Sequence, residues 1–294
     1  MKPCAVHYRL AGGLGNQLFI YSAGLDYAFR TGRRVVYDAY DVAGPSFHHD
    51  SGLQKLSVKR KIFKRTFWLG TRRRLVSLLG VVLRRFKLPP VDFSSPELGY
   101  SESVFAQIHA LTVRGHFQTY RHLLNPEVSK EMATLRPNLI RREFRDAIES
   151  MTKTHSLSIH IRLGDYVPLK SKFGLLSPDY FSQAVSTAFA QTNQQIQRVC
   201  LFSDDLPRAL SYLERADLKG KPLLTFDGLT DEEELFLMAE SDHLIISNST
   251  FSWWSGALGN SEKIVIAPAK WFKSLDDPKD LYPASWIKIP SQWI

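Results

Sequence analysis

The sequence predicts an α/β fold whose second half is a doubly wound sheet of parallel strands. Two patterns indicate this fold. Strand-like and helical segments alternate regularly after residue 156, and a strand, a glycine-rich loop, a helix and a second strand open the chain. The composition agrees, because 294 residues with 44% hydrophobic side chains are enough for one large or two ordinary packed domains.

The opening of the chain consists of four short segments. Residues 5–10 form an apolar strand, residues 11–15 form the glycine-rich loop, and residues 34–38 form the second strand. Between them, apolar or small residues recur at the spacing of one helix face, namely Leu18, Ser22, Leu25 and Phe29. Such a β-loop-α-β unit is the natural start of an open α/β sheet.

The middle of the chain has a less regular pattern. Residues 39–114 lack clear alternation, and we assign no elements there. This stretch contains four prolines, Pro45, Pro89, Pro90 and Pro96. We expect a strand at 114–118 and a charged surface helix at 141–149. A domain boundary near residue 150 then divides the chain into domains at 1–150 and 151–294.

The second half has the most regular pattern. Five strands are expected, at residues 156–162, 198–203, 222–226, 243–247 and 263–267. Helical segments separate them, and five strands alternating with four helices imply a doubly wound parallel sheet. Two helix starts carry capping signals, because Ser177 precedes Pro178 and Thr230 stands three residues before Glu233.

Cysteine usage and hydropathy bear on location. The two cysteines, Cys4 and Cys200, are too few for a disulfide framework or a cysteine-rich metal site, which suits a reducing cytosol. No segment has the length of a signal peptide's apolar region or approaches the ~20 apolar residues of a membrane span. We therefore expect a cytoplasmic protein.

The candidate functional residues lie beyond the carboxyl ends of the strands, where open α/β sheets bind their ligands. In the strand that begins at residue 156, alternation places Leu157, Ile159 and Ile161 on one face. His160 and Arg162 share the other face.

Arg162 is the first candidate. A planar guanidinium at a strand end is suited to bind a diphosphate and to stabilise its charge as it leaves. Gly164 permits a sharp turn, and Asp165 can orient the guanidinium or a ligand. The alternative is a buried Arg162–Asp165 ion pair that only holds the turn.

Two further strand ends carry polar residues. Asp204 or Asp205 can accept hydrogen bonds from the N1 and N2 groups of guanine, and the alternative is that each caps the following helix. Ser249, Thr250, Phe251 and Ser252 open a helix, where hydroxyls and free backbone N–H groups form an anion site for the diphosphate. The alternative there is an ordinary N-cap. We expect Trp253 and Trp254 to pack in the core.

The glycine-rich loop near the N-terminus is a weaker signal. Gly13 and Gly15 do not fit the spacing of a dinucleotide-binding loop, and the P-loop lysine is absent. We expect Asn16 and Gln17 to face the crevice between the domains, where amides would hydrogen-bond to sugar hydroxyls of an acceptor.

Several chemistries find no support in the sequence. There is no Asp-x-Asp and no His, Asp or Glu cluster with metal-ligand spacing, so we expect no metal and no other cofactor. Arg162 and a helix N-terminus would take the place of the metal. No serine nucleophile elbow and no Cys–His arrangement indicate covalent catalysis, and we expect no nucleic-acid partner.

Four ordered motifs resemble the α-1,2-fucosyltransferases of glycosyltransferase family 11. They are Gly12-Gly-Leu-Gly-Asn-Gln-Leu-Phe19, His160-Ile-Arg-Leu-Gly-Asp-Tyr166, Phe202-Ser-Asp-Asp205 and Ser249-Thr-Phe-Ser-Trp-Trp254. Shorter similarities lie at Gly115–Gln118, Glu234–Met238 and Ile264–Pro268, so the resemblance covers nearly the whole chain.

The resemblance implies a GT-B fold of two Rossmann-like lobes, with the donor site in the C-terminal lobe. It implies metal-independent, inverting transfer of fucose from GDP-β-L-fucose to the 2-hydroxyl of a galactose-type acceptor, in the synthesis of a surface glycan or O-antigen. It also implies that Arg162 binds the β-phosphate, that an Asp of the Ser-Asp-Asp motif binds guanine, and that Ser249 to Ser252 line the pyrophosphate site. The glycine-rich loop with Asn16 then lies across the cleft.

The chain departs from the family at one position, since Leu163 stands where the motif usually has a second arginine. Alternation points this side chain away from the face of His160 and Arg162, so we expect donor binding to survive. Asp165 and His160 are the titratable groups near the donor, and the general base stays unassigned between them.

Residues 55–87, here called the basic segment, carry twelve Lys or Arg and no Asp or Glu, within a net charge of +9. One interpretation is an interfacial segment on an anionic membrane at the inner face, which would suit a lipid-linked acceptor. The other is a solvated basic face. The rival functions are transfer with another linkage, such as α-1,6, and a non-catalytic nucleotide- or glycan-binding protein of the membrane periphery.

Overall fold

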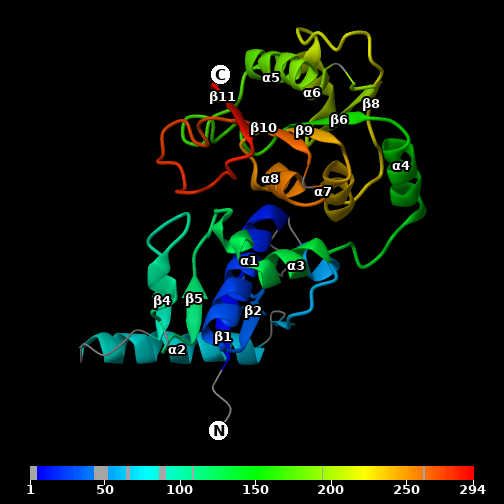
Figure 1. Ribbon diagram of the computed structural model, residues 1–294. Coiled ribbons are helices and arrows are strands. Elements are labelled where there is room, and N and C mark those ends of the chain that lie inside the picture. Colours follow the sequence, from blue (N-terminus) through cyan, green and yellow to red (C-terminus); the bar gives the residue numbers. More distant parts are fainter. Residues whose placement is uncertain are drawn as a thin grey trace. The chain divides into compact units, whose positions relative to one another are not determined.

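The chain folds into two compact units (Figure 1). A computed structural model describes residues 5–42, 52–63, 67–85, 91–107, 109–193, 195–260 and 262–294. Unit 1 comprises Met1–Asn138 and Pro278–Tyr282, and unit 2 comprises Leu139–Asp277 and Pro283–Ile294. Four residues named above lie outside the described ones, namely Cys4, Pro45, Pro89 and Pro90, and so do residues 64–66 and 86–87 of the basic segment.

Unit 1 is built on a parallel sheet of order β3-β2-β1-β5-β4. Its strands are β1 (Val6–Arg9), β2 (Val35–Asp38), β3 (Ile62–Phe63), β4 (Asp92–Ser94) and β5 (Thr112–Arg114). Its helices are α1 (Leu14–Thr31), α2 (Phe67–Arg85) and α3 (Pro126–Ala133), with short 3₁₀ turns η1 (Gly52–Lys55), η2 (Glu102–Val104) and η3 (Arg121–Leu124).

The expected β-loop-α-β opening is present as β1, α1 and β2. Helix α1 ends at Gly32, which adopts the left-handed conformation and donates its N–H to the carbonyl of Ala28. Its inward face is buried at Leu18, Ser22 and Leu25. The sheet is completed by β3 and β4, two short strands in the stretch where the sequence showed no pattern.

The strand expected at 114–118 is displaced in the structure. Strand β5 runs from Thr112 to Arg114 and pairs with both β1 and β4. It cannot extend further, because Phe117 has a positive φ of 53°, which a strand does not accommodate. The ring of Phe117 instead packs over Gly115, where a β-carbon would lie 2.6 Å from it.

Unit 2 contains a six-stranded parallel sheet of order β11-β10-β9-β6-β7-β8. Its strands are β6 (Ser156–Ile161), β7 (Arg198–Ser203), β8 (Leu223–Leu224), β9 (His243–Ile245), β10 (Ile264–Pro268) and β11 (Ile287–Ile289). Its helices are α4 (Arg142–Thr152), α5 (Pro178–Gln191), α6 (Leu206–Leu213), α7 (Asp231–Ala239) and α8 (Thr250–Ala257). The predicted parallel sheet of alternating strands and helices is confirmed, and β11 adds an edge strand that was not predicted.

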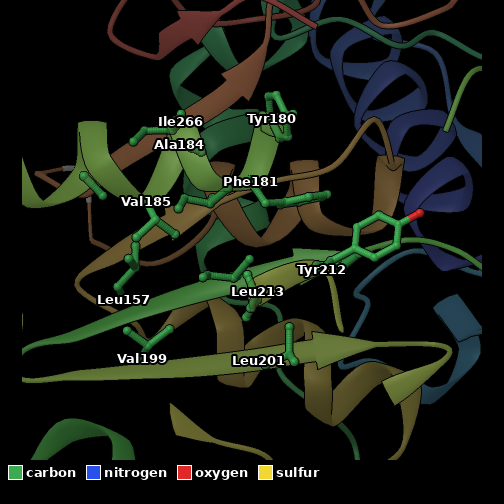
Figure 2. Close-up of a cluster of buried hydrophobic side chains, with 14 of the residues drawn as sticks. Leu157, Tyr180, Phe181, Ala184, Val185, Val199, Leu201, Tyr212, Leu213 and Ile266 are labelled. Atoms are coloured by element: carbon green, nitrogen blue, oxygen red, sulfur yellow. The ribbon is translucent and has the colours of Figure 1, made fainter. Parts of the chain in front are cut away.

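The core of unit 2 explains why its strands are apolar. Figure 2 shows Leu157 of β6 and Val199 and Leu201 of β7 beside Phe181 and Val185 of α5, all of them buried. The opposite side of β6 is also buried, at Ser158 and His160 among others. Parallel strands covered on both sides carry near-continuous apolar runs, which is why the sequence revealed them.

The predicted helix caps of unit 2 are confirmed. The Ser177 side chain accepts a hydrogen bond from the N–H of Tyr180 at the start of α5. At α7, Thr230 and Glu233 form a reciprocal capping box.

The chain divides between Asn138 and Leu139 rather than near residue 150. Helix α4 belongs to unit 2 because it packs on α7 and because Arg141, directly before it, forms an ion pair with Glu233. The charged segment was therefore correctly expected to be a helix but was assigned to the wrong side of the boundary. Among the described residues, the helices fall short of the length and apolarity that crossing a membrane requires.

Candidate active site

The carboxyl ends of three neighbouring strands in unit 2 bring the predicted donor-site residues together. Strand β6 lies between β9 and β7 in the sheet. The segments that follow these strands begin at Arg162, Asp204 and Ile246, and they meet at one edge of the sheet because parallel strands end on the same side.

Arg162 is held in place by two carboxylates. Its Nε donates to Oδ1 of Asp165 at 2.8 Å and lies 3.3 Å from Oδ2 of Asp204. Its side chain is 24% exposed. In the part of the chain that the structure describes, its two terminal nitrogens make no hydrogen bond, so they remain available to bind an anion bidentately. From the sequence, an ion pair with Asp165 was the alternative to anion binding. In the structure Arg162 forms this ion pair and still has nitrogens available for an anion.

Asp204 fixes the turn after β6. Its Oδ1 accepts the N–H of Leu163 at 2.9 Å, and its Oδ2 accepts the N–H of Gly164 at 3.0 Å. A β-carbon at Gly164 would lie 2.7 Å from this carboxylate, so the residue at 164 must be small. Both carboxylate oxygens of Asp204 thus accept hydrogen bonds within the protein. This structural role explains an Asp at position 204 even if the residue does not bind guanine.

Asp205 caps the helix that follows it. Its side chain accepts a hydrogen bond from the N–H of Arg208 at 3.3 Å at the start of α6. The capping alternative therefore describes what Asp205 does in the structure, and guanine binding by either Asp204 or Asp205 stays a prediction.

His160 links strand β6 to the segment before α8. It is only 3% exposed, and its Nδ1 lies 2.9 Å from Oγ of Ser247. Its ring centroid lies 5.7 Å from that of Phe251. Burial, with a contribution from the Arg162 charge, lowers the pKa of His160 to about 3. A group with this pKa is a poor proton acceptor at neutral pH, which disfavours His160 as the general base, and the base stays unassigned.

The segment before α8 is hydrogen-bonded to its surroundings through Asn248. The side-chain amide of Asn248 donates to the carbonyls of Phe173 and Trp271, and the main-chain carbonyl of Asn248 accepts from the hydroxyl of Tyr166. Ser249 is the N-cap of α8 and accepts the N–H of Phe251 at 3.3 Å.

The predicted anion segment therefore contains an ordinary cap, with further polar groups around it. The Ser252 hydroxyl donates to the Ser249 carbonyl, and Thr250 is half-buried beside them. Trp253 and Trp254 are completely buried, which confirms that they pack in the core.

Leu163 confirms the alternation argument. Its side chain is fully buried and belongs to the core cluster with Leu157, Ile159 and Ile161. The side chain of Leu163 points away from the face of Arg162. The family motif usually has its second arginine at this position.

Two residues near the site were not singled out for it from the sequence. Tyr166 donates its hydroxyl to the Asn248 carbonyl and joins the turn after β6 to the segment before α8. Glu234 of α7 is half-buried, and burial, together with the charges of Asp231 and Asp204, raises its pKa to about 7. Both lie inside recognisable motifs, but their contacts come from elements distant in the sequence.

The glycine-rich loop of unit 1 has a structural role. Gln17 is fully buried, and its side chain donates to the Gly12 carbonyl at 2.8 Å and accepts the N–H of Leu53 at 3.2 Å. It cannot offer its amide to a sugar, so the acceptor-binding assignment of Gln17 is wrong. Gly13 is the N-cap of α1 and Gly15 is buried within it.

Asn16 differs from Gln17 because it is only half-buried. Its Oδ1 accepts a hydrogen bond from Nε2 of Gln118 at 3.0 Å. Its role toward an acceptor stays a prediction.

A separate cavity of about 350 Å³, lined by both polar and apolar residues, lies in unit 1 at the carboxyl ends of β1, β4 and β5. Its charged lining residues are Arg9, Asp41, Glu97 and Arg114, two of each sign. Arg9 pairs with Asp41 at 2.6 Å, and Arg114 pairs with Asp92. His116 also lines the cavity, and burial lowers its pKa. Among the described residues, no three His, Cys, Asp or Glu side chains are grouped to hold a metal ion.

Two units with parallel α/β sheets, and a charged strand-end site in the second, define a protein with the GT-B type of fold. Solved structures of similar fold include the fucosyltransferase NodZ from Bradyrhizobium, with a TM-score of 0.50 at 14% identity over 87% of this chain and 93% of NodZ. A FUT1 mutant from Arabidopsis thaliana in complex with GDP has a TM-score of 0.51 at 13% identity, over 92% of this chain and 72% of FUT1.

The family follows from the sequence comparison. The model of glycosyl transferase family 11 matches residues 112–290, and the chain belongs to this family. A protein of Escherichia coli named alpha-1,2-colitosyltransferase is 28% identical over 96% of this chain and 97% of its own length. The O-antigen biosynthesis glycosyltransferase WbnK of Escherichia coli is 27% identical over 95% of this chain and 99% of its own length. The chain is thus a glycosyltransferase that acts in glycan synthesis.

Proposed function

We propose that this glycosyltransferase moves L-fucose from GDP-β-L-fucose to the 2-hydroxyl of a galactose-type acceptor, with inversion at the anomeric carbon, during the synthesis of a surface glycan such as an O-antigen. Two relatives support the proposal by their names, one by an α-1,2 linkage and the other by O-antigen synthesis. The resemblance of four motifs to α-1,2-fucosyltransferases supports the donor and the linkage.

The observation that carries the proposal is the position of Arg162. Its Nε is fixed by Asp165 and Asp204, and its terminal nitrogens are available for the oxygens of a diphosphate. Because the guanidinium is already oriented, little reorganisation is needed when negative charge develops on the leaving GDP. The N-terminus of α8, joined to β6 through His160 and Ser247, is the second group that favours an anion in this unit.

The reaction breaks the bond between the anomeric carbon and the β-phosphate oxygen, and forms a bond from that carbon to the acceptor oxygen on the opposite face. Arg162 stabilises the departing diphosphate, which makes a metal ion unnecessary in the proposed mechanism. The acceptor proton has no assigned base: His160 has too low a pKa, and Asp165 is bound to Arg162.

The cavity of unit 1 is the proposed acceptor site. Guanidinium groups there donate hydrogen bonds and carboxylates accept them, and the equal number of each among Arg9, Asp41, Glu97 and Arg114 favours an uncharged, hydroxyl-rich ligand over an acidic one. We therefore propose that neutral galactosides are better acceptors than glycans with an acidic sugar at the acceptor end.

A second candidate concerns the sugar that is transferred. The relative named alpha-1,2-colitosyltransferase covers nearly all of the chain, which favours colitose as the alternative donor sugar with the same linkage. Transfer with an α-1,6 linkage and a non-catalytic role are the remaining alternatives to be tested.

The experiment offers GDP-fucose or GDP-colitose to a panel of neutral and acidic galactosides, with and without EDTA, and determines the linkage of the product by NMR. We expect an α-1,2-fucoside on a neutral acceptor, at an unchanged rate in EDTA. Transfer of colitose alone, another linkage, or dependence on a divalent ion would each correct one part of the proposal, and no transfer to any acceptor would reject the enzyme function.

Two variants test the role of Arg162. Arg162→Ala should lower the rate of transfer on the order of 10²-fold or more, because it removes the group that stabilises the leaving diphosphate. Arg215→Ala is the matched control, since Arg215 lies on the same unit, is 74% exposed and pairs with the exposed Asp179 on the surface. Unchanged transfer by Arg162→Ala would contradict the proposed mechanism.

A further inference from the structure

Helix α2 of unit 1, whose place is labelled in Figure 1, carries several exposed apolar side chains. Five of its large apolar side chains are exposed, by 62% at Leu75, 64% at Leu78, 42% at Leu79, 58% at Val81 and 51% at Val82. Leu75, Leu78, Leu79 and Val82 stand at positions i, i+3, i+4 and i+7, which form one stripe along a helix. We call these five residues the α2 stripe.

The stripe is not the face with which α2 packs on its own unit. That inner face is marked by Val76 and Gly80, which are buried, and by two arginines. Arg72 donates to the Leu111 carbonyl at 3.1 Å, and Arg73 pairs with Asp38 at 3.0 Å. The helix is therefore anchored by one side, and its apolar stripe faces outward.

The charges of the basic segment are all of one sign. The basic segment that contains α2 has twelve Lys or Arg and no acidic residue. Arg74 and Arg85 are exposed on the helix itself, on the side that does not pack. An apolar stripe with exposed Arg74 and Arg85 on the same helix is electrostatically complementary to a surface that is apolar inside and anionic outside.

We propose that the α2 stripe is a membrane-binding surface, which inserts into the interface of an anionic phospholipid bilayer while Arg74 and Arg85 bind the lipid phosphates. The helix lies in the plane of the interface and does not cross the bilayer. Apolar burial and charge attraction contribute together, so binding depends both on the stripe and on anionic lipid.

A second copy of the chain is the competing occupant, and the charges disfavour it. Two stripes that met face to face would bring two sets of arginines together, with no acidic residue of the basic segment to compensate them. An anionic phospholipid surface offers negative charge to the arginines and an apolar interior to the apolar side chains. It therefore complements both the charge and the apolar stripe of α2.

The experiment measures partitioning of the full chain into vesicles by co-sedimentation. The vesicles are made of phosphatidylcholine alone or of phosphatidylcholine with phosphatidylglycerol. We expect binding to the anionic vesicles that is at least about tenfold stronger than to the neutral ones and that weakens with added salt. The double variant Leu78→Glu/Val82→Glu should lower binding to the anionic vesicles by at least about tenfold.

The matched control is Leu124→Glu, because Leu124 and Leu78 are both 64% exposed and both belong to unit 1. This control should bind vesicles like the unchanged chain, and all three proteins should keep the same helix content by circular dichroism. Absence of binding to anionic vesicles, or equal binding by the double variant, would overturn the proposal. A dimer in sedimentation velocity that the double variant separates, without vesicle binding, would assign the stripe to a second copy instead.

Discussion

At the scale of single residues, the site combines groups that could bind a ligand with groups that hold them in place. Arg162 keeps its terminal nitrogens available, whereas Asp204 uses both carboxylate oxygens on the backbone of the next turn. His160, in the same motif as Arg162, is buried on Ser247. Spacing alone cannot separate these roles, because each depends on which neighbouring strand lies beside β6.

Leu163 gives a test of side-chain direction in this motif. Leu163→Arg should destabilise the protein by about 3–5 kcal/mol, because it places an unpaired charge in the core of unit 2. Urea unfolding measures the free energy of unfolding, and Leu163→Met is the control, with an expected cost below about 1.5 kcal/mol. A cost for Leu163→Arg as small as that of the control would show that the residue at 163 can turn to solvent.

Glu234 predicts a specific dependence of stability on pH. Burial, Asp231 and Asp204 raise its pKa in the folded protein to about 7, so the folded state holds this proton more tightly than the unfolded chain does. The contribution is fully present below the pKa of an unfolded Glu and is lost as the pH rises toward 7.

The measurement is the free energy of unfolding from about pH 5 to about pH 8, for the unchanged chain and for Glu234→Gln. Stability should fall more steeply with rising pH in the unchanged chain, because the Gln variant has no proton to lose at this position. Glu232→Gln, on the same helix turn, serves as the comparison. Parallel curves for the unchanged chain and Glu234→Gln would contradict the raised pKa.

At the scale of elements, helix α2 packs on unit 1 by its inner face. Polar contacts of the arginines on that face help to hold the helix in place. Arg73 pairs with Asp38 at the end of β2 and with Asp41 just beyond it. The Asp38 side chain is completely buried, whereas that of Asp41 is 40% exposed. The pair with Asp38 is therefore the more costly one to break.

Arg73→Ala should lower the free energy of unfolding by about 3 kcal/mol, because it leaves the Asp38 carboxylate buried without its cation. The neighbouring variant Arg74→Ala should change it by less than about 0.5 kcal/mol, since Arg74 is exposed. Both values come from urea unfolding at one pH. If the two variants cost the same, the Arg73–Asp38 pair does not stabilise the fold.

The elements also show what sequence patterns can and cannot predict. The strands of unit 2 were predictable because both of their faces are buried, so each is an apolar run between polar loops. Strands β3 and β4 are only two and three residues long, too short for any periodicity. In α2 apolar residues occupy both the packed and the exposed face, so no single face marked it as an amphipathic helix.

The site was predictable to a similar degree. Alternation along β6 correctly separated Arg162 from Leu163. The role of Asp204 could not be predicted from the sequence. Its hydrogen bonds run from the end of β7 to the turn after β6, and residue spacing does not reveal which strands are neighbours in the sheet. Gln17 was misassigned for a related reason: its partner Leu53 lies in the stretch without a recognisable pattern.

At the scale of the whole molecule, the units are not formed from consecutive halves of the chain. Pro278–Tyr282 belongs to unit 1, although the residues on both sides of it belong to unit 2. This short segment is bound to unit 1 through Asp280, whose carbonyl accepts from the Thr119 hydroxyl at 2.7 Å and from the N–H of Tyr120 at 3.0 Å.

The excursion of Pro278–Tyr282 has a consequence for synthesis on the ribosome. Unit 1 lacks a part of itself until residue 282 has left the exit tunnel, and unit 2 lacks its edge strand β11 until Ile289 has followed. Domains arranged in series can fold one after the other as each leaves the ribosome. These two units cannot complete their folding in that way, because each needs a segment that is translated late. Unit 1 is complete only after residue 282 and unit 2 only after residue 289, so a ribosome stalled shortly before residue 278 would carry two incomplete units rather than one finished and one nascent.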